Sequence, residues 1–191
     1  MRQMSEEYKD WDGITATPSD PDMFWALRTA RPADHAFITK SWLRSYERSA
    51  PHDRALRTQY LTNTNRVLGG QVRDAYFAQY HQVIEEVLDT STILVACHRT
   101  EPDVVVGFVV GAVHSTGCLV LHYVYVVSRY RNAGVARCLV RELKDSLLPQ
   151  ITDSQVVVTC TTPSARLQIS RYNACCVPIT TFVGREGRKN Q

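Results

Sequence analysis

The chain carries Arg131-Asn132-Ala133-Gly134-Val135-Ala136 between two apolar segments of different periodicity. The segment before it, Cys118–Val127, is an almost unbroken run of β-branched, aromatic and other apolar residues, which predicts a buried strand. The segment after it, Val135–Leu148, has apolar residues at helical spacing. The sequence therefore predicts a strand, a tight turn and a helix, with the unpaired N–H groups of the helix N-terminus at the turn.

This turn has the features of an anion site. Helix N-termini bind phosphate and pyrophosphate because their first N–H groups are unpaired and the helix dipole favours negative charge. Gly134 allows the backbone to approach a ligand closely, and Ala136 is too small to block it. Arg131 adds a positive charge at the rim. The alternative is an ordinary strand–turn–helix connection in which this arginine is solvated.

Length and composition predict one soluble domain. The chain has 191 residues, which is enough for one well-packed domain and short for two. Its apolar share of 44% and charged share of 21% are ordinary for a globular protein. Residues 1–22 are polar and contain a glycine and two prolines, which predicts a loose leader, and the basic residues 185–191 predict a loose tail. We therefore expect the domain to span residues 23–184.

The composition also argues against several classes of function. A net charge of +3 is too small to indicate nucleic-acid binding. No apolar run is long enough to cross a membrane, and the N-terminal residues lack the hydrophobic core of a signal peptide. None of the six cysteines forms a Cys-x-x-Cys pair, and no histidine stands at a metal-finger spacing. We therefore expect free thiols, no metal site and a cytoplasmic location.

The rest of the chain predicts an α/β (α+β) pattern. Strands are expected over residues 23–28, 92–98, 104–113, 119–127, 155–160 and 178–184, and helices from residue 34, over 72–88, over 135–148 and over 163–172. Asp34 is the expected N-cap of the first helix. One face of that helix is expected to carry Ala36, Phe37, Trp42 and Leu43.

The turn and the order of elements together resemble the GNAT N-acetyltransferase superfamily. The pyrophosphate loop of that family reads Arg/Gln-x-x-Gly-x-Gly/Ala, and Arg131, Gly134 and Ala136 fill its three defining positions. The resemblance runs from about Met23 to Gly184. It implies a mixed, mostly antiparallel central sheet of six to seven strands, flanked by about four helices.

The resemblance implies that the cofactor is acetyl-CoA (coenzyme A). In this family the fourth strand separates from the fifth beyond a bulge, and the pantetheine arm bonds to the backbone of the fourth strand. By position, that backbone belongs to Tyr125, Val126 and Val127. The pyrophosphate would lie on the loop and the first helical turn, which consist of Arg131, Asn132, Ala133, Gly134, Val135 and Ala136.

The implied chemistry, transfer of an acetyl group to a primary amine of a protein or small molecule, needs a general base and an acid that reprotonates the leaving thiolate. Family members with a base on the fourth strand carry a glutamate there. This strand has no carboxylate, so His122 is the candidate base. The other interpretation of His122 is a buried histidine that is hydrogen-bonded across the sheet. His114 is a weaker candidate, or a residue at the edge of a hairpin.

Tyr172 stands where the family often places the tyrosine that acts as the acid, although Ala174–Pro178 depart from the Gly-Phe that usually follows. By strand alternation His122 should share a face with Val124 and Val126, while Tyr123 and Tyr125 should pack on the opposite face.

The first two helices and their connection recognise the substrate in this family. Here the segment carries Trp42, Arg44, Tyr46, Arg48, His52, Arg54 and Arg57. These residues either orient an acidic substrate or form a solvated helix face. The patch formed by Tyr76, Phe77, Tyr80 and His81 is expected to lie in the core.

Three phrases, at residues 37–46, 121–126 and 171–173, also resemble GNAT-like proteins carried by bacteriophages. That resemblance implies action in the host cytoplasm. It also raises an alternative, in which a GNAT-fold protein without catalysis is a binding or structural component, for example of a phage particle, with virion proteins as partners. Exposed strand edges leave a homo-oligomer open in either case.

Overall fold

The computed structural model describes residues 24–49, 66–152, 155–159, 174–177 and 179. The expected leader and tail, the helix over 163–172 and nearly all of the strand over 178–184 lie outside these residues.

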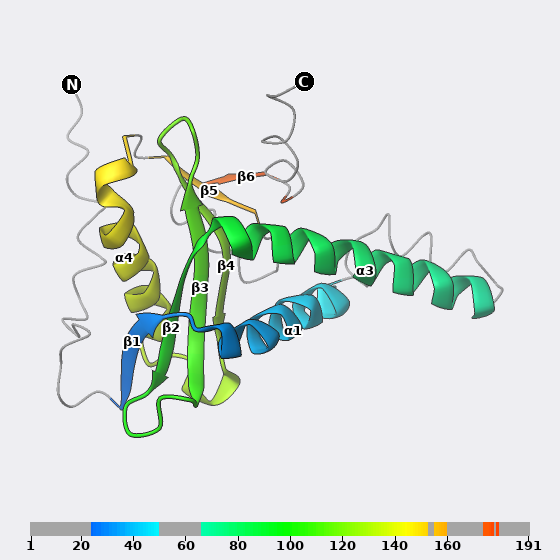
Figure 1. The fold of residues 1–191 in the computed structure, drawn as a ribbon, viewed down its shortest axis with the longest axis horizontal. Helices are drawn as coiled ribbons and strands as arrows, with labels where there is room; N and C mark the ends of the chain where they lie inside the picture. Colours follow the sequence, from blue (N-terminus) through cyan, green and yellow to red (C-terminus); the bar gives the residue numbers. More distant parts are fainter. Residues whose placement is uncertain (1–23, 50–65, 153–154, 160–173, 178, 180–191) are drawn as a thin grey trace.

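Six strands and three α-helices follow one another in the described residues (Figure 1). They are β1 (Trp25–Thr29), α1 (Pro32–Ser49), α3 (Arg66–Thr90), β2 (Thr92–His98), β3 (Val105–Val113), β4 (Leu119–Val126), α4 (Val135–Leu147), β5 (Val156–Val158) and β6 (Cys175–Cys176). Two 3₁₀ helices, η3 (Ser128–Tyr130) and η4 (Leu148–Gln150), flank α4.

The strands form one mixed sheet in the order β1-β2-β3-β4-β5-β6. The pairings from β1 to β4 are antiparallel, and β4–β5 and β5–β6 are parallel. Helices α1 and α3 cover one face of the sheet and α4 covers the other (Figure 1). The expected α/β fold with a mostly antiparallel sheet is confirmed.

Alternation along the strands divides the core into two layers. On β2, Ile93 and Val95 belong to the layer under α1 and α3, while Leu94 and Ala96 belong to the layer under α4. Helix α4 contributes an apolar stripe to its layer, made of Val135, Cys138, Leu139, Leu143 and Leu147. The helix that follows the loop 131–134 is therefore packed firmly on the sheet.

Helix α1 differs from expectation in its start and its buried face. It begins at Pro32, a residue suited to the first helical position, so Asp34 lies in the first turn and is not the N-cap. The Asp34 carboxylate accepts a 2.7 Å hydrogen bond from the Arg31 N–H and a bidentate pair from Arg28, at 2.6 and 2.9 Å. The sheet-facing side carries Ile38 and Trp42, four residues apart, whereas Ala36 and Phe37 are exposed.

A β-bulge interrupts β4 at His122. Val110 on β3 pairs with Tyr123, but the next residue, Gly111, pairs with Leu121, so His122 is an extra residue on β4. The extra residue shifts the alternation by one position. Leu121 and Val124 therefore pack in the same layer, under α4.

Two other elements differ from their expected bounds. Helix α3 begins at Arg66 instead of near residue 72, so Gly69 and Gly70 lie inside it. Strand β6 occupies Cys175–Cys176, just before the segment expected to form the last strand. The five cysteines in the described part of the chain are all free thiols. Among the helices that the structure describes, none has the apolar length needed to span a membrane.

Candidate active site

The loop between η3 and α4 lies at the surface of the molecule. Arg131, Asn132 and Ala133 are exposed, and Gly134, the N-cap of α4, is half-buried and makes no side-chain cap hydrogen bond. Asn132 and Gly134 both adopt left-handed conformations, with φ of 67° and 78°. Asparagine and glycine tolerate this conformation best. Where left-handed and right-handed backbone conformations alternate along a chain, successive N–H groups point toward a common point. The start of α4 therefore has the geometry of an anion-binding turn.

Contacts on both sides fix this loop to the sheet. The Arg131 side chain donates from Nε to the carbonyl oxygen of Val126, over 3.3 Å. The Tyr130 ring stacks on Phe24 at 5.2 Å between centroids, and the Arg129 guanidinium lies 4.6 Å from the centroid of the Tyr130 ring. Val135, the first residue of α4, is buried between this helix and the sheet. The loop is thus exposed but anchored.

The second half of β4 leads directly into the loop. Val126 pairs with Gly107 on β3, and the Val127 N–H donates to the Val106 carbonyl oxygen over 2.9 Å. On its other side β4 pairs with β5 only from Leu119 to Leu121 within the described residues. The residues expected to bond the pantetheine arm, 125–127, thus lie beyond the bulge and beyond the described β4–β5 pairing.

His122 lies at the point where this pairing ends. Its side chain is buried, with 4% of the residue exposed, and burial lowers its pKa to about 4. Its Nδ1 lies 3.2 Å from the Oγ1 of Thr159, the residue that follows β5. The structure therefore contains the cross-sheet hydrogen bond expected for a buried histidine. The lowered pKa keeps the His122 ring neutral near pH 7.

Thr159 was not singled out by its sequence, although a signal was present. The strand expected over 155–160 carries one hydroxyl, at Thr159, and the parallel register of β4 and β5 places it beside His122. In the structure the Thr159 N–H donates to the Leu121 carbonyl oxygen over 3.1 Å, and its hydroxyl donates to the His122 carbonyl oxygen over 3.3 Å. Thr159 is 4% exposed.

Aromatic rings pack against β4 on the side of α1. Tyr123 stacks on Trp42 with 4.9 Å between centroids and 9° between planes. Tyr125 contacts Phe108 at 5.4 Å and Phe37 at 6.1 Å, both between centroids. Tyr123 and Tyr125 pack in the layer under α1 and α3. Trp42, one of the residues considered for substrate recognition, is instead fully buried in that layer.

His114 and Tyr172 are the two remaining catalytic candidates. The Nδ1 of His114 accepts a hydrogen bond from the Thr116 N–H at 3.3 Å, and lies 2.9 Å from the Thr116 hydroxyl, which agrees with a residue at the edge of a hairpin. Tyr172 lies outside the described residues, so its role as an acid stays a prediction.

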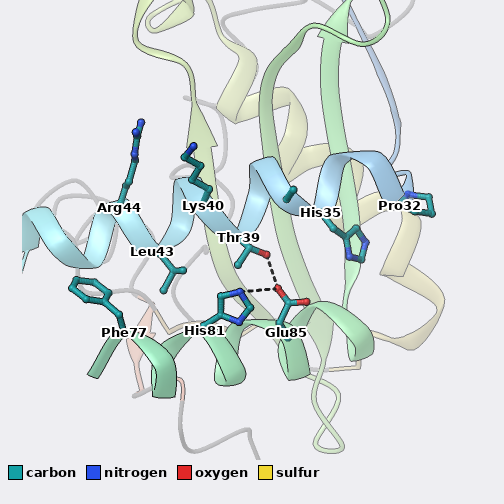
Figure 2. Close-up of a pocket in the computed structure, with 10 residues that line it drawn as sticks. Pro32, His35, Thr39, Lys40, Leu43, Arg44, Phe77, His81 and Glu85 are labelled. Atoms are coloured by element: carbon teal, nitrogen blue, oxygen red, sulfur yellow. Dashed lines mark hydrogen bonds and ion pairs between the residues drawn. The ribbon is translucent and has the colours of Figure 1, made fainter. Parts of the chain in front are cut away.

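A separate groove of about 800 Å³ lies between α1 and α3 (Figure 2). Thr39 on α1 donates to the Oε1 of Glu85 on α3 over 2.8 Å, and His81 lies 4.0 Å from the same oxygen. Arg44 and His81 both line the groove. His81 was expected to lie in the core, but its side chain is about half exposed. None of the lining residues belongs to β4, β5 or the 131–136 loop, so this groove is distinct from the residues expected to transfer the acetyl group.

The mixed sheet, the bulge on its fourth strand and the glycine-containing turn after it define a mixed α/β protein with the arrangement that the sequence resemblance implies. The acetyltransferase (GNAT) family matches residues 54–167, which is more than half of the chain. The chain belongs to this family.

Several solved structures are similar to the chain at low identity. A GNAT acetyltransferase from Staphylococcus aureus Mu50 is 13% identical, with 76% of this chain and 81% of that one covered and a TM-score of 0.44. An integron cassette protein from V. cholerae is 13% identical, with 81% and 88% covered and a TM-score of 0.47. The Escherichia coli GNAT N-acetyltransferase YhbS, solved with CoA, is 20% identical, with 68% and 59% covered and a TM-score of 0.42. No curated protein matches the chain.

Proposed function

We propose that this protein is an acetyl-CoA-dependent N-acetyltransferase that acetylates a primary amine of a protein or small molecule. The observation that carries the proposal is the surface loop 131–134 at the start of α4, where no side chain caps the helix, directly after a β4 segment that extends past the bulge and past the described pairing with β5. Family membership supplies the reaction class.

The residues present fit a pyrophosphate. From Ser128 to Ala136 the chain has two arginines and no carboxylate, and the first turn of α4 has no acidic residue. An acidic side chain there would repel the ligand, whereas N–H groups and arginines attract it. Arg131, Asn132, Ala133, Gly134, Val135 and Ala136 would hold the pyrophosphate. The backbone of Tyr125, Val126 and Val127 would hold the pantetheine arm.

His122 would take the proton released by the amine. Acetyl-CoA supplies an acetyl group already activated as a thioester. A neutral imidazole has a lone pair for the proton, and the depressed pKa keeps His122 in that form throughout the physiological range. Its basicity is low, but the amine nitrogen becomes strongly acidic as its bond to the acetyl carbon forms, so a weak base is sufficient. Tyr172 is proposed as the acid that protonates the leaving thiolate.

Release of free thiol from acetyl-CoA tests this function. The full chain would be incubated with acetyl-CoA and a panel of amines that includes a lysine peptide, a polyamine and an aminoglycoside. We expect amine-dependent thiol release that falls at least about 100-fold in His122→Gln, the size of effect that removal of a general base produces. Saturable acetyl-CoA binding without thiol release on any amine would contradict the enzyme and favour a binding component.

A further inference from the structure

The groove between α1 and α3 has a positively charged rim. Lys40 and Arg44 stand one turn apart on α1, line the groove and extend from the same side of the helix (Figure 2). Both are exposed, and neither forms an ion pair with a carboxylate among the described residues. Glu85, the acidic residue in the lining, accepts a hydrogen bond from Thr39 and lies 4.0 Å from His81. The charge that the groove offers to a ligand is therefore positive.

Apolar side chains from both helices line the same groove. Leu43 on α1 and Phe77 on α3 line it from its two sides (Figure 2), and Pro32 and Ala36 continue the apolar lining toward the start of α1. A groove of this kind between two helices suits the apolar face of an amphipathic helix. The positive rim favours a segment that carries carboxylates beside its apolar face.

Residues 1–22 of this chain have a charge opposite to that of the groove. They carry six carboxylates and two basic side chains, a net charge of −4, so the rest of the chain, given a total of +3, carries +7. Four of these carboxylates and one lysine fall in residues 4–12, which we call the acidic segment. Such a charge asymmetry favours contact between a terminal segment and the body of a protein.

The acidic segment also has the spacing of anchors for a helical groove. Met4, Tyr8 and Trp11 stand at i, i+4 and i+7, which places three apolar side chains on one face of a helix. On the same helix Glu7 and Asp12 would flank this face. A segment whose composition predicts a loose chain can order when it binds. This pattern therefore matches the apolar lining and the positive rim of the groove.

The acidic segment is long enough to reach the groove from its own chain. Fully extended, the chain from Trp11 to Phe24 spans at most about 45 Å. The path from Phe24 along β1 to Pro32, where the groove begins, is at most about 28 Å, and the lining continues for about 18 Å along α1 to Arg44. Because the segment is tethered, its effective concentration at the groove is high.

We propose that the groove between α1 and α3 is a docking site for the acidic segment of the same chain. In this arrangement the apolar anchors contact Leu43 and Phe77, and the carboxylates lie beside Lys40 and Arg44. The contact does not depend on acetyl transfer, because none of the lining residues belongs to the proposed cofactor site.

Carbodiimide cross-linking of the full chain tests this contact, because the reagent joins an amine directly to a nearby carboxylate. The chain has four lysines, at positions 9, 40, 144 and 189. We expect mass spectrometry to find Lys40 joined to the acidic segment in a yield about tenfold or more above that of Lys144, which lies on α4 over the other face of the sheet. Equal yields at the two lysines, or no such product at Lys40, would overturn the proposal.

The same cross-linking on a mixture of unlabelled and nitrogen-15-labelled protein identifies the source of the segment. Products that join Lys40 to a segment of the same label support docking within one chain. Products found mainly between the two labels would assign the groove to the acidic segment of a second copy, and would overturn docking within one chain.

Fluorescence of Trp11 gives an independent measurement on the full chain. The other two tryptophans, Trp25 and Trp42, are 1% and 0% exposed, so acrylamide quenches tryptophan fluorescence mainly through Trp11. Docking predicts weak quenching in the wild-type protein. Quenching of Trp11 as strong as in a synthetic peptide of residues 1–22 would overturn the proposal.

Charge reversal on each side separates docking from a general loosening of the helix. We expect quenching to rise about threefold or more in Lys40→Glu/Arg44→Glu, in which the rim repels the acidic segment, and to stay at the wild-type level in the control Lys144→Glu. Adding Glu7→Lys and Asp12→Lys to the double variant should restore protection. An equal rise in the control, or no restoration in the combined variant, would contradict docking at this rim.

Discussion

At the scale of single residues, the proposed cofactor site requires small or uncharged side chains where larger or acidic ones would interfere. Ala133 and Ala136 are exposed at the start of α4, and Gly134 adopts a left-handed conformation that disfavours any residue with a Cβ. A substitution at Gly134 would combine backbone strain with any effect on a ligand. Ala133 does not have a positive φ, so it is the better position for a charge.

The pair Ala133→Glu and Ala133→Gln tests whether this loop binds an anion. A carboxylate a few ångströms from a pyrophosphate is repelled by more than about 1 kcal/mol at the dielectric of a protein surface. We expect Ala133→Glu to weaken acetyl-CoA binding about tenfold or more in calorimetry, and Ala133→Gln to change it little. Equal affinities in both variants and the wild type would show that the pyrophosphate lies elsewhere.

The buried His122 predicts a specific pH dependence of stability. Its pKa is about 4 in the folded protein and near 6.5 in the unfolded chain, so the unfolded chain binds the extra proton between these values. The stability contributed by the neutral form is complete above pH 6.5 and is lost as the pH falls toward 4. The loss amounts to about 3 kcal/mol.

Urea unfolding at pH 7 and pH 4.5 measures this effect. The free energy of unfolding of the wild-type protein should fall more steeply between the two pH values than that of His122→Gln, which cannot titrate there. Parallel losses in both proteins would mean that His122 is not held neutral by burial.

At the scale of elements, the bulge on β4 organises the site. It places His122 at the end of the described β4–β5 pairing and moves Tyr123 and Tyr125 into the layer under α1. Gly111, opposite the bulge on β3, lies close to both β4 and α4. A Cβ at this position would be 2.8 Å from the Val120 carbonyl oxygen and 2.7 Å from Leu143 Cδ2.

Gly111→Ala should therefore destabilise the protein by about 1–3 kcal/mol, the usual cost of overpacking a core. Part of this cost comes from Leu143, so the penalty should shrink by about 0.5 kcal/mol or more in a Leu143→Ala background. Chemical unfolding of the four proteins in this cycle measures the coupling. A penalty below about 0.5 kcal/mol in the wild-type background would contradict the close packing of α4 on β3.

At the scale of the whole molecule, the sequence predicted the strands of the sheet and the place of the loop because their signals are local, whereas the mixed topology of the sheet followed from the resemblance to the GNAT family. The apolar strands 92–98, 104–113 and 119–127 and the stripe of α4 identify themselves by periodicity, and their hairpin turns lie between them. No local signal in this chain marks the position of the bulge, because an extra residue in a strand leaves no trace in an apolar run. The expected face of His122 therefore rests on a regular alternation that the structure does not have.

The features that the sequence did not predict depend on contacts between segments that are far apart in the chain. The partnership of His122 with Thr159 needs the parallel register of β4 and β5, whose paired residues Leu119 and Val156 are far apart in the chain. The burial of Trp42 needs the stacking of α1 on Tyr123, because an aromatic residue in a basic helix is equally consistent with a surface contact. The start of α1 depends on Pro32 and on the ion pair that joins Asp34 in the helix with Arg28 in β1.

Calorimetric titration of the full chain with acetyl-CoA tests the central claim most directly. We predict saturable binding at one site, and a rise of several degrees in Tm at a ligand concentration of about 100 times Kd. The Ala133→Glu variant should lose most of that heat and of that rise. An absence of saturable heat at millimolar acetyl-CoA, with an unchanged Tm in the wild-type protein, would contradict it.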